Sequence, residues 1–355
     1  MNRKIKVLIV DDSVSVQNVL QQILMSDPEL EVIGIASDPY EAVAKIAENL
    51  PDVITLDIEM PRMDGLTFLS KLMKQHPIPV VVISSVAGEG SHNGIKALKL
   101  GALEIITKPK LSSQKQLEEY SIRIVDAIKA SALTEQVRLN SKKSVKTENT
   151  TLSQNKLSSK DLQDPPRLSE EVILIGASTG GTEVISKILK GLRSDLPGIL
   201  IVQHMPGEFT KAFANRLNLE CNLSVKEAEQ GDVVKMGCVY IANGFNHLQL
   251  IMENGINKCK LEMGELVNRH RPSVDVLFKS ASKFQGKNIT AILLTGMGSD
   301  GARGMLELHE IGARTFAQDE KSSAIFGMPN EAIKLNAAKK IGNPDELIKW
   351  INTTF

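Results

Sequence analysis

The sequence has no net charge and few aromatic residues. Its 355 residues include 42 lysines and arginines against 42 aspartates and glutamates, so no overall field attracts nucleic acid or an anionic membrane. Aromatic residues make up 4% of the chain and no basic stripe accompanies them, which excludes the usual base-stacking modules for nucleic acids. A charged partner must therefore be recognised by a local patch, and we expect no nucleic-acid partner.

Cysteines and long apolar segments are also scarce. Cys221, Cys238 and Cys259 are far apart in the chain and form no C-x-x-C pair, so neither a disulfide framework nor a zinc site is expected. The apolar run Ile5–Val10 is short, contains a lysine and precedes two aspartates, which does not fit a signal peptide. Since no segment is long enough to span a bilayer, we expect a cytoplasmic protein that is not inserted in the membrane.

The length and a change in composition indicate two domains. A chain of 355 residues exceeds what one hydrophobic core usually organises. Residues 141–167 are rich in Ser, Lys, Asn, Gln and Thr, contain few large apolar residues and end near two prolines, which is typical of a flexible linker. We predict a first domain over residues 1–130, a helix end and linker over 131–168, and a second domain over 169–355.

Short apolar runs alternate with amphipathic stretches in the first domain. The runs predict five strands, at Val7–Val10, Val32–Ala36, Val53–Leu56, Val80–Ile83 and Glu104–Thr107. A helical pattern follows each strand, and the last helix is expected to begin near Leu117. Five strand–helix units predict a parallel, flavodoxin-like (βα)5 sheet whose functional site lies at the carboxyl ends of the strands.

The second domain is predicted to be α/β and doubly wound as well. Its first strand, Val172–Ile175, leads into the loop Gly176–Gly181 and a helix through Lys190. Further strands are predicted at Ile199–Gln203, Cys238–Ala242, His247–Ile251 and Thr290–Leu294. The middle two of these are expected to form a β-hairpin around Asn243 and Gly244.

Charged residues collect at the strand ends of the first domain. Asp11 and Asp12 follow the first strand, Asp57 lies at the end of the third and Lys108 follows the fifth, so one rim should hold all four. Crowded carboxylates repel one another unless a cation joins them, and their hard oxygens suit Mg²⁺. Asp57 could then accept a phosphoryl group, with Lys108 stabilising its charge and Ser84 donating a hydrogen bond.

The first domain resembles the receiver domain of two-component response regulators over roughly residues 4–130. The shared features are the acidic pair, Asp57 with a backbone carbonyl two residues later at Glu59, Pro61, the Asp64–Gly65 turn, Ser84 and Lys108–Pro109. The resemblance implies phosphorylation of Asp57 with Mg²⁺ bound by Asp11, Asp12, Asp57 and Glu59. The sequence departs at Ile105, where many receivers carry a Tyr or Phe whose rotation reports phosphorylation. The alternative is a flavodoxin-like domain whose acidic residues merely cap helices.

A serine between small residues marks the start of the second domain. In the run Ile173–Gly181, a tight strand-to-helix turn would lift the Ser178 hydroxyl to a helix N-terminus, where free N–H groups and the helix dipole favour a developing negative charge. A glycine-rich loop of this kind can also cradle a phosphate. It has, however, neither the lysine of a P-loop nor the G-x-G-x-x-G spacing.

Two sets of partners for Ser178 are open. An α/β-hydrolase order would use Asp232, Asp275 or Asp300 with His309. Against it, the chain has no HGGG-type segment and His309 lies within a helical pattern. His204 is the better base because it follows the next strand and should reach the same rim, and Asp300 follows another apolar strand and could orient the imidazole. Taken singly, each residue also fits an ordinary role in a turn or helix cap.

The second domain resembles the CheB family of chemotaxis protein-glutamate methylesterases over nearly all of residues 170–340. The matching motifs are Gly176–Gly181, Gln203–Pro206, Phe209-Thr with Phe213-Ala and Arg216-Leu217, Arg269–Phe278, Thr295–Gly298, Asp300–Ala302 and Gln318–Pro329. The resemblance implies a triad of Ser178, His204 and Asp300, with the Met297 N–H facing the oxyanion and no cofactor in the esterase.

The resemblance also implies a substrate, a partner and a form of control. The expected substrates are γ-methyl esters of glutamates on methyl-accepting chemotaxis receptors, with deamidation of receptor glutamines by the same acyl chemistry. A chemotaxis histidine kinase would supply the phosphoryl group. The unphosphorylated receiver would obstruct the cleft of the esterase domain. The enzyme is expected to be a monomer. Apart from the resemblance, His270 with its flanking Arg269 and Arg271 could bind an acidic receptor segment or could form a solvated basic turn.

The sequence leaves two other functions open. The receiver could be joined to a non-catalytic module that binds phosphate or a nucleotide, or to a hydrolase acting on a different ester.

Overall fold

The structure is a computed structural model that describes residues 3–60, 63–85, 90–108, 114–141 and 167–355. Pro61, Pro109 and nearly all of the expected linker lie outside the described residues. No helix within the described ranges is long and apolar enough to cross a membrane.

The first domain is built on a parallel sheet with the strand order β2-β1-β3-β4-β5. Its strands are β1 (Ile5–Val10), β2 (Leu30–Ala36), β3 (Val53–Leu56), β4 (Val80–Ser84) and β5 (Glu104–Thr107). The helices that alternate with them are α1 (Val14–Met25), α2 (Pro39–Glu48), α3 (Gly65–Gln75), α4 (Gly90–Lys99) and α5 (Gln114–Ser141). The five predicted strands and the flavodoxin-like topology are confirmed.

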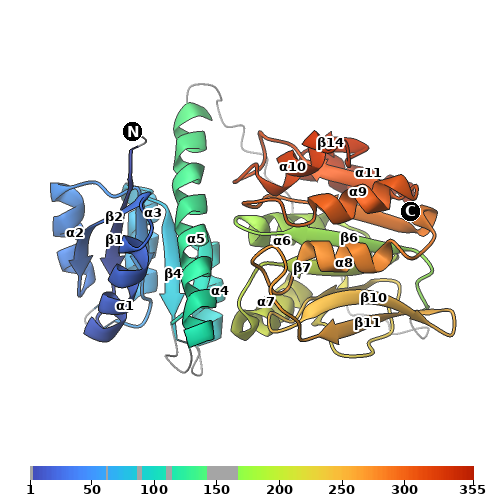
Figure 1. The fold of residues 1–355 in the computed structure, drawn as a ribbon, viewed down its shortest axis with the longest axis horizontal. Helices are drawn as coiled ribbons and strands as arrows, with labels where there is room; N and C mark the ends of the chain where they lie inside the picture. The colour runs from blue at the N-terminus through green and yellow to red at the C-terminus, as the bar shows by residue number, and fades with distance from the viewer. Residues whose placement is uncertain (1–2, 61–62, 86–89, 109–113, 142–166) are drawn as a thin grey trace.

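Both faces of this sheet are covered because successive side chains of a strand point to opposite sides. On β1, Val7 and Ile9 pack with residues of α1 and α5, whereas Leu8 and Val10 pack with residues of α2, α3 and α4. Apolar residues are therefore favoured on both faces of each strand, which is why the strands appear in the sequence as mostly apolar runs and not as an apolar–polar alternation. In Figure 1, α5 stands between this sheet and the second domain.

The second domain contains a seven-stranded sheet in the order β14-β13-β12-β6-β7-β9-β8, with every pairing parallel. Its strands are β6 (Val172–Ala177), β7 (Gly198–Gln203), β8 (Ser224–Glu227), β9 (Cys238–Ile241), β12 (Ile289–Leu293), β13 (Arg314–Gln318) and β14 (Lys340–Gly342). The central position of β6, between β12 and β7, decides which strand ends meet.

Helices cover both faces of the second sheet. Residues of α6, α7 and α11 share one apolar core, and residues of α8, α9, α10 and β10 share the other. The bounds are α6 (Gly181–Gly191), α7 (Gly207–Glu220), α8 (Val274–Ala281), α9 (Ala302–Glu310), α10 (Met328–Lys334) and α11 (Pro344–Thr354), with a 3₁₀ turn at Gly286–Asn288.

The second domain contains a β-hairpin, but the predicted hairpin between the strands at Cys238–Ala242 and His247–Ile251 was wrong. The strand at Cys238–Ile241 belongs to the large sheet, where it pairs in parallel with β7 and β8. The hairpin joins β10 (His247–Glu253) to β11 (Ile256–Glu262) through Asn254 and Gly255, both of which have positive φ. The reason is that Asn254-Gly255 supplies the left-handed pair of a two-residue turn, whereas the turn at Asn243–Gly244 carries the chain out of the sheet.

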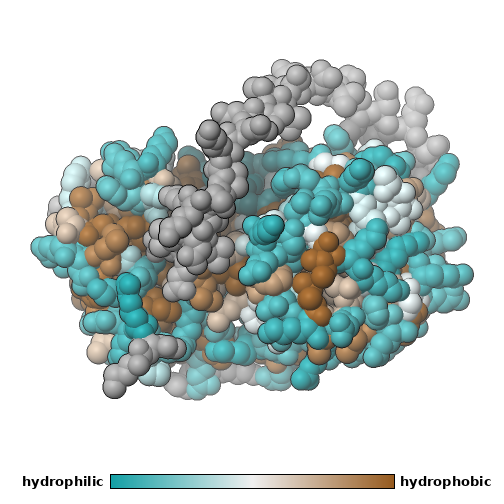
Figure 2. Space-filling model, turned by 90° about the horizontal axis from the view of Figure 1, so that it is seen from above, coloured by the Kyte–Doolittle hydropathy of each residue, from teal (hydrophilic) through white to brown (hydrophobic). Residues whose placement is uncertain are grey.

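The two domains pack directly against each other. The apolar core that holds α4 of the first domain continues into Phe209 and Phe213 of α7. A β-carbon added at Gly94 on α4 would lie 2.7 Å from the Phe209 ring, so the absence of a side chain there permits the close approach. The face seen in Figure 2 is mostly hydrophilic, and its apolar residues form small separate patches.

Candidate functional sites

The carboxyl ends of β1, β3 and β5 bring the expected acidic residues together. Carboxylate oxygens of Asp11, Asp12 and Asp57 lie within 4.8 Å of one another. Lys108 Nζ lies 2.7 Å from an oxygen of Asp57 and 3.1 Å from one of Asp11. The backbone N–H of Lys108 donates to the carbonyl of Ser84, which ends β4, so Ser84 belongs to the same rim.

Electrostatics at this rim are dominated by burial. Burial raises the pKa of Asp57 to about 6, although the ammonium of Lys108 and the N–H of Glu59 oppose the shift. Burial raises the pKa of Asp11 in the same way. Three crowded carboxylates with one ammonium leave an excess of negative charge, and this set of hard oxygen donors fits Mg²⁺.

The start of α3 lies close to Asp57 at the end of β3. Asp64 caps α3 by accepting a hydrogen bond from the N–H of Thr67 at 2.9 Å. A β-carbon at Gly65 would lie 2.2 Å from the carbonyl oxygen of Asp57, so only glycine lets α3 begin here. The sequence signal of Asp64-Gly65 thus has two separate physical causes, a helix cap and a close backbone approach.

The second site forms at three neighbouring strand ends of the large sheet. Ser178 follows β6, His204 follows β7, and Asp300 lies between β12 and α9. The backbone N–H of His204 donates to the carbonyl of Ala177 at 3.0 Å, which joins the end of β7 to the residue before Ser178. His204 Nε2 lies 2.9 Å from Asp300 Oδ2. The structure therefore brings the three expected residues together.

Asp300 is surrounded by hydrogen-bond donors. It is 1% exposed, and the donors within 3.2 Å of its carboxylate are His204 Nε2, Asn268 Nδ2, Ser273 Oγ and the N–H groups of Val274 and Asp275. Burial alone would raise the pKa of Asp300, but the hydrogen bonds from His204 and the other donors hold it well below its usual range. The carboxylate is therefore an anion fixed at the N-terminus of α8.

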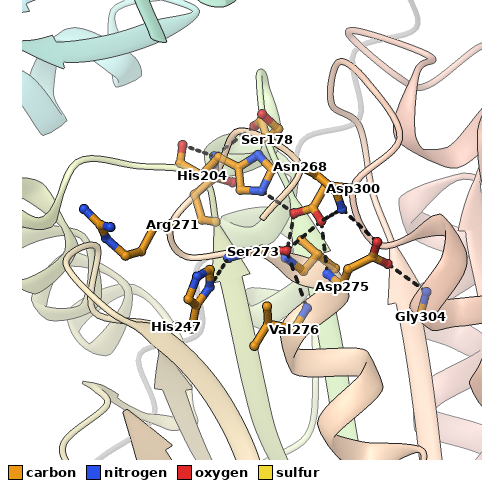
Figure 3. Close-up of polar contacts among 12 residues, drawn as sticks. Ser178, His204, His247, Asn268, Arg271, Ser273, Asp275, Val276, Asp300 and Gly304 are labelled. Carbon is orange, nitrogen blue, oxygen red and sulfur yellow. Dashed lines mark hydrogen bonds and ion pairs between the residues drawn. The ribbon is translucent and has the colours of Figure 1, made fainter. Parts of the chain in front are cut away.

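The His204 imidazole lies between Ser178 and Asp300 in Figure 3. With Nε2 engaged by Asp300, its Nδ1 is buried and has no hydrogen-bond partner among the described residues. The ring of His270 stacks on it, with centroids 3.7 Å apart and planes 16° apart. Burial and the adjacent His204 lower the pKa of His270 well below its usual value, so His270 packs against His204 as a neutral ring.

Two backbone features lie near the serine. Gly180, the N-cap of α6, has a φ of 77°, which places the turn after Ser178 in a conformation that glycine favours. Met297 lines the same cavity as Ser178 and His204. In the described part of the chain, nothing accepts a hydrogen bond from its N–H group.

The alternative partners of Ser178 lie elsewhere. His309 occupies the last turn of α9 and does not line the cavity. Asp232 pairs with Lys226 at 2.9 Å. Asp275 is adjacent, but its carboxylate accepts from Asn268 and from the N–H of Gly304 rather than from His204. The α/β-hydrolase order with His309 is therefore not supported by the geometry.

The polar support of Asp300 was missed by sequence reasoning. Asn268 donates to Asp300 at 2.7 Å and to Asp275 at 2.8 Å, and Ser273 is both the N-cap of α8 and a donor to Asp300. A serine immediately before a helical pattern was the available signal, since it predicts a helix cap. Nothing in the sequence pairs either residue with an aspartate about 30 positions away.

Residues of the first domain line the cavity of the second. The cavity has a volume of about 260 Å³, and its wall includes Ser178 and His204 together with Ile105 of β5 and Arg123 of α5. The Thr179 hydroxyl donates to Glu104 at 2.7 Å, next to Ser178. Burial raises the pKa of Glu104 to about 7. Ile105 is buried at this interface, where an aromatic switch residue is expected in many receivers.

Fold and geometry together define a class: a receiver with a clustered acidic rim, joined to an α/β domain with a serine, a histidine and an aspartate at one sheet edge. Family models agree with this class. Residues 7–120 match the response regulator receiver domain, and residues 173–351 match the CheB methylesterase domain. The chain therefore belongs to the CheB methylesterase family, and it is a hydrolase with a receiver domain.

Individual relatives cover both domains. The chain is 50% identical to protein-glutamate methylesterase/protein-glutamine glutaminase 2 of Oleidesulfovibrio alaskensis, over 96% of each protein. It is 44% identical to the protein of that name from Rhizobium johnstonii, over 100% of this chain and 99% of that protein. The crystal structure of the Thermotoga maritima CheB methylesterase catalytic domain aligns at a TM-score of 0.52 and 35% identity, over 53% of this chain and 100% of that one.

Proposed function

We propose that the enzyme hydrolyses γ-methyl esters of glutamates on methyl-accepting chemotaxis receptors, and deamidates receptor glutamines, under the control of Asp57 phosphorylation. The names of the full-length relatives support the two reactions. The observation that carries the assignment of residues is the 2.9 Å contact of His204 Nε2 with the Asp300 anion, beside Ser178 at the adjoining strand end.

In the proposed acylation step, Ser178 Oγ attacks the ester carbonyl. His204 takes the serine proton on Nδ1, because Nε2 is held by Asp300. The Asp300 carboxylate stabilises the resulting imidazolium, and the N–H of Met297 faces the oxyanion. The proton then passes to the methoxide, which leaves as methanol.

Water completes the cycle. His204 deprotonates a water molecule that attacks the acyl-enzyme, and glutamate is released with Ser178 restored. A glutamine side chain follows the same route with ammonia as the leaving group, which is the chemistry in the second half of the relatives' names. No cofactor enters either reaction.

In the proposed receiver, Asp11, Asp12, Asp57 and the Glu59 carbonyl would hold Mg²⁺, which supplies charge neutralisation for phosphoryl transfer. Asp57 would accept the phosphoryl group from a chemotaxis histidine kinase in the cytoplasm. Lys108 and Ser84 would then contact the new phosphoryl oxygens. The family resemblance alone supports the kinase, the cytoplasmic location and a monomeric enzyme.

Control would follow from the position of the receiver. Residues of β5 and α5 line the cavity next to Ser178, so a receptor segment and the docked receiver compete for the same space. Phosphorylation would weaken docking. A full shift from closed to open needs about 5.5 kcal/mol of differential stabilisation, so partial activation is expected.

The test is methanol release from methylated receptor membranes, with and without acetyl phosphate and Mg²⁺. The wild-type chain should release methanol faster with the phosphodonor, and Asp57→Asn should keep only the basal rate. Ser178→Ala should lose several orders of magnitude of turnover in both conditions. Near-normal methanol release by Ser178→Ala would refute the proposed nucleophile.

A fluorophosphonate probe tests the alternative of a binding module without catalysis. The proposed nucleophile should be labelled at Ser178 in the wild-type chain, and His204→Ala should suppress the labelling. A phosphate-binding loop has no reason to react.

A further inference from the structure

The contacts between α5 and the loop before α8 point to how the enzyme selects its substrate. We infer that Arg269 and Arg271 form a recognition pair for an acidic helix, and that Glu119 and Asp126 of α5 occupy this pair as a substrate mimic when the receiver is docked. The inference rests on the proposed function, because it names the feature by which the substrate of that same site is recognised.

The two arginines are held beside the candidate catalytic imidazole. His270, which separates them in sequence, stacks on His204 with ring centroids 3.7 Å apart. Val267 and His270 exchange two backbone hydrogen bonds of 3.0 Å, and Arg271 Nη1 donates to the carbonyl of Gly264 at 2.8 Å. Arg269 has a φ of 71°, a left-handed conformation that a non-glycine residue adopts at a cost. The loop is thus closely anchored, and it presents both guanidinium groups at the cavity.

Helix α5 supplies a matching acidic face. Glu119 lies 3.2 Å from Arg271 Nη2, and Asp126 lies 3.4 Å from Arg269 Nη1. The two acidic residues are seven positions apart, so they lie on one face of the helix, about 10 Å apart along its axis. Arg123 lies between them and donates to the carbonyl of Arg271 at 3.0 Å. A helix with carboxylates two turns apart therefore fits this pair of arginines.

The charge of the open cavity favours an anionic occupant. The second domain contributes three ionisable groups of fixed charge to the described cavity wall: Arg269, Arg271 and Asp300. The charge of Asp300 is already satisfied by its ring of donors. When α5 leaves, the two arginines lose the carboxylates of Glu119 and Asp126 and the rim becomes cationic, which attracts an acidic helix and repels a basic one.

The ion pairs between the two arginines and α5 are weak enough for an acidic substrate helix to replace α5. The Arg269 side chain is 58% exposed, so its ion pair with Asp126 adds little to stability, whereas the Arg271–Glu119 pair is less exposed, with 18% and 25% of its side chains open to solvent. Neither pair has the short bidentate geometry of a strong arginine–carboxylate contact. The arginines can therefore pass from the receiver to a substrate without a large barrier, and the choice between them depends on the local concentration of each acidic helix.

The experiment separates recognition by the arginines from simple opening of the cleft. Three full-length variants are compared with wild type: Glu119→Gln with Asp126→Asn, Arg269→Gln with Arg271→Gln, and Lys99→Gln as the matched control. Lys99 pairs with Glu220 at the same interface but away from the cavity. Each is assayed on methylated receptor membranes and on p-nitrophenyl acetate, a small uncharged ester.

Without phosphodonor, all three variants should hydrolyse the small ester several-fold faster than wild type, because each loses contacts that hold the receiver. On receptor membranes, the α5 variant and Lys99→Gln should also be faster. The arginine variant should not be faster than wild type on receptor membranes. With acetyl phosphate, its KM for receptor should be at least tenfold that of wild type. Arg269→Lys with Arg271→Lys should restore most of that loss, and added salt should raise the wild-type KM.

Two results would overturn the inference. One is an arginine variant that gains receptor turnover as much as the α5 variant does, since the arginines would then only hold the receiver. The other is an arginine variant that also loses the small-ester activity, which would place these residues in the reaction itself. If phosphorylated wild type hydrolyses the small ester but releases no methanol from receptors, the proposed function fails first, and the inference fails with it.

Discussion

At the scale of single residues, the candidate hydrolase site depends on how one carboxylate is held. Asp300 is buried, and each hydrogen bond that it accepts offsets the cost of burying its charge. Asn268 has a special position among the donors because its amide joins Asp300 to Asp275, which in turn accepts from the N–H of Gly304 in α9. We infer that Asn268 is a positioning residue that acts through Asp300.

Asn268→Ala should lower kcat for methanol release by about ten- to a hundredfold, since a hydrogen bond to a charged group contributes roughly 1.5–3 kcal/mol. The KM for receptor should change little, because Asn268 supports Asp300 rather than the substrate. The measurement is steady-state methanol release by the phosphorylated chain. Asn222→Ala, at an exposed asparagine, is the control. An unchanged kcat in Asn268→Ala would show that the remaining donors suffice.

At the scale of secondary-structure elements, the order of strands places the candidate catalytic groups. Because β6 lies between β12 and β7, three loops that are far apart in sequence start from adjacent points of one sheet edge. Helix α8 then directs its free N-terminal N–H groups at Asp300. The same carboxylate therefore serves the proposed reaction and caps a helix, so its loss should have two effects.

Asp300→Asn should abolish most activity and also lower the free energy of unfolding by about 1–3 kcal/mol, because an amide leaves donors of α8 without an acceptor. Ser178→Ala should abolish activity with little effect on stability. Denaturant unfolding of both variants, followed beside activity, tests this pair of expectations. Equal stability of the two variants would mean that the cap at α8 contributes nothing.

At the scale of the whole molecule, the contact between the domains contains a titratable group. Glu104 has a pKa of about 7 in the docked arrangement, raised by burial from an ordinary value of 4.5. Its carboxyl accepts from Thr179, the residue after Ser178. Between pH 4.5 and about 7, Glu104 is therefore protonated in the docked form and ionised in the undocked form. Docking should weaken as the pH rises from 4.5 to about 7 and then level off.

The unphosphorylated chain should thus be less inhibited at pH 8 than at pH 6. Glu104→Gln keeps a neutral acceptor for Thr179 and should remove the effect. The ratio of the wild-type basal rate to the Glu104→Gln basal rate, measured on a small ester, should rise by up to about tenfold between pH 6 and pH 8. Taking the ratio cancels the titration of the catalytic residues themselves. A ratio that is constant with pH would mean that Glu104 does not titrate in the docked form.

Much of this architecture could be predicted because the sequence repeats one local rule. Each buried strand of a parallel sheet is a mostly apolar run, and the candidate site residues Asp57, Lys108, Ser178 and His204 each follow the end of such a strand. Carboxyl ends of parallel strands share an edge, so the runs predicted which groups would meet. The hairpin was misassigned because the second domain has two Asn-Gly pairs, and only the second, Asn254-Gly255, joins antiparallel strands.

By itself, the sequence determined the two folds, the acidic rim and the set of serine, histidine and aspartate, because hydrophobic period and strand-end position are local properties of the chain. Only the tertiary structure decided which imidazole nitrogen meets Asp300, that Asn268 and Ser273 support it, and that Glu104 and α5 lie against the cleft. These are contacts between side chains far apart in sequence. They depend on packing between elements and between domains, for which a single sequence carries no periodic signal.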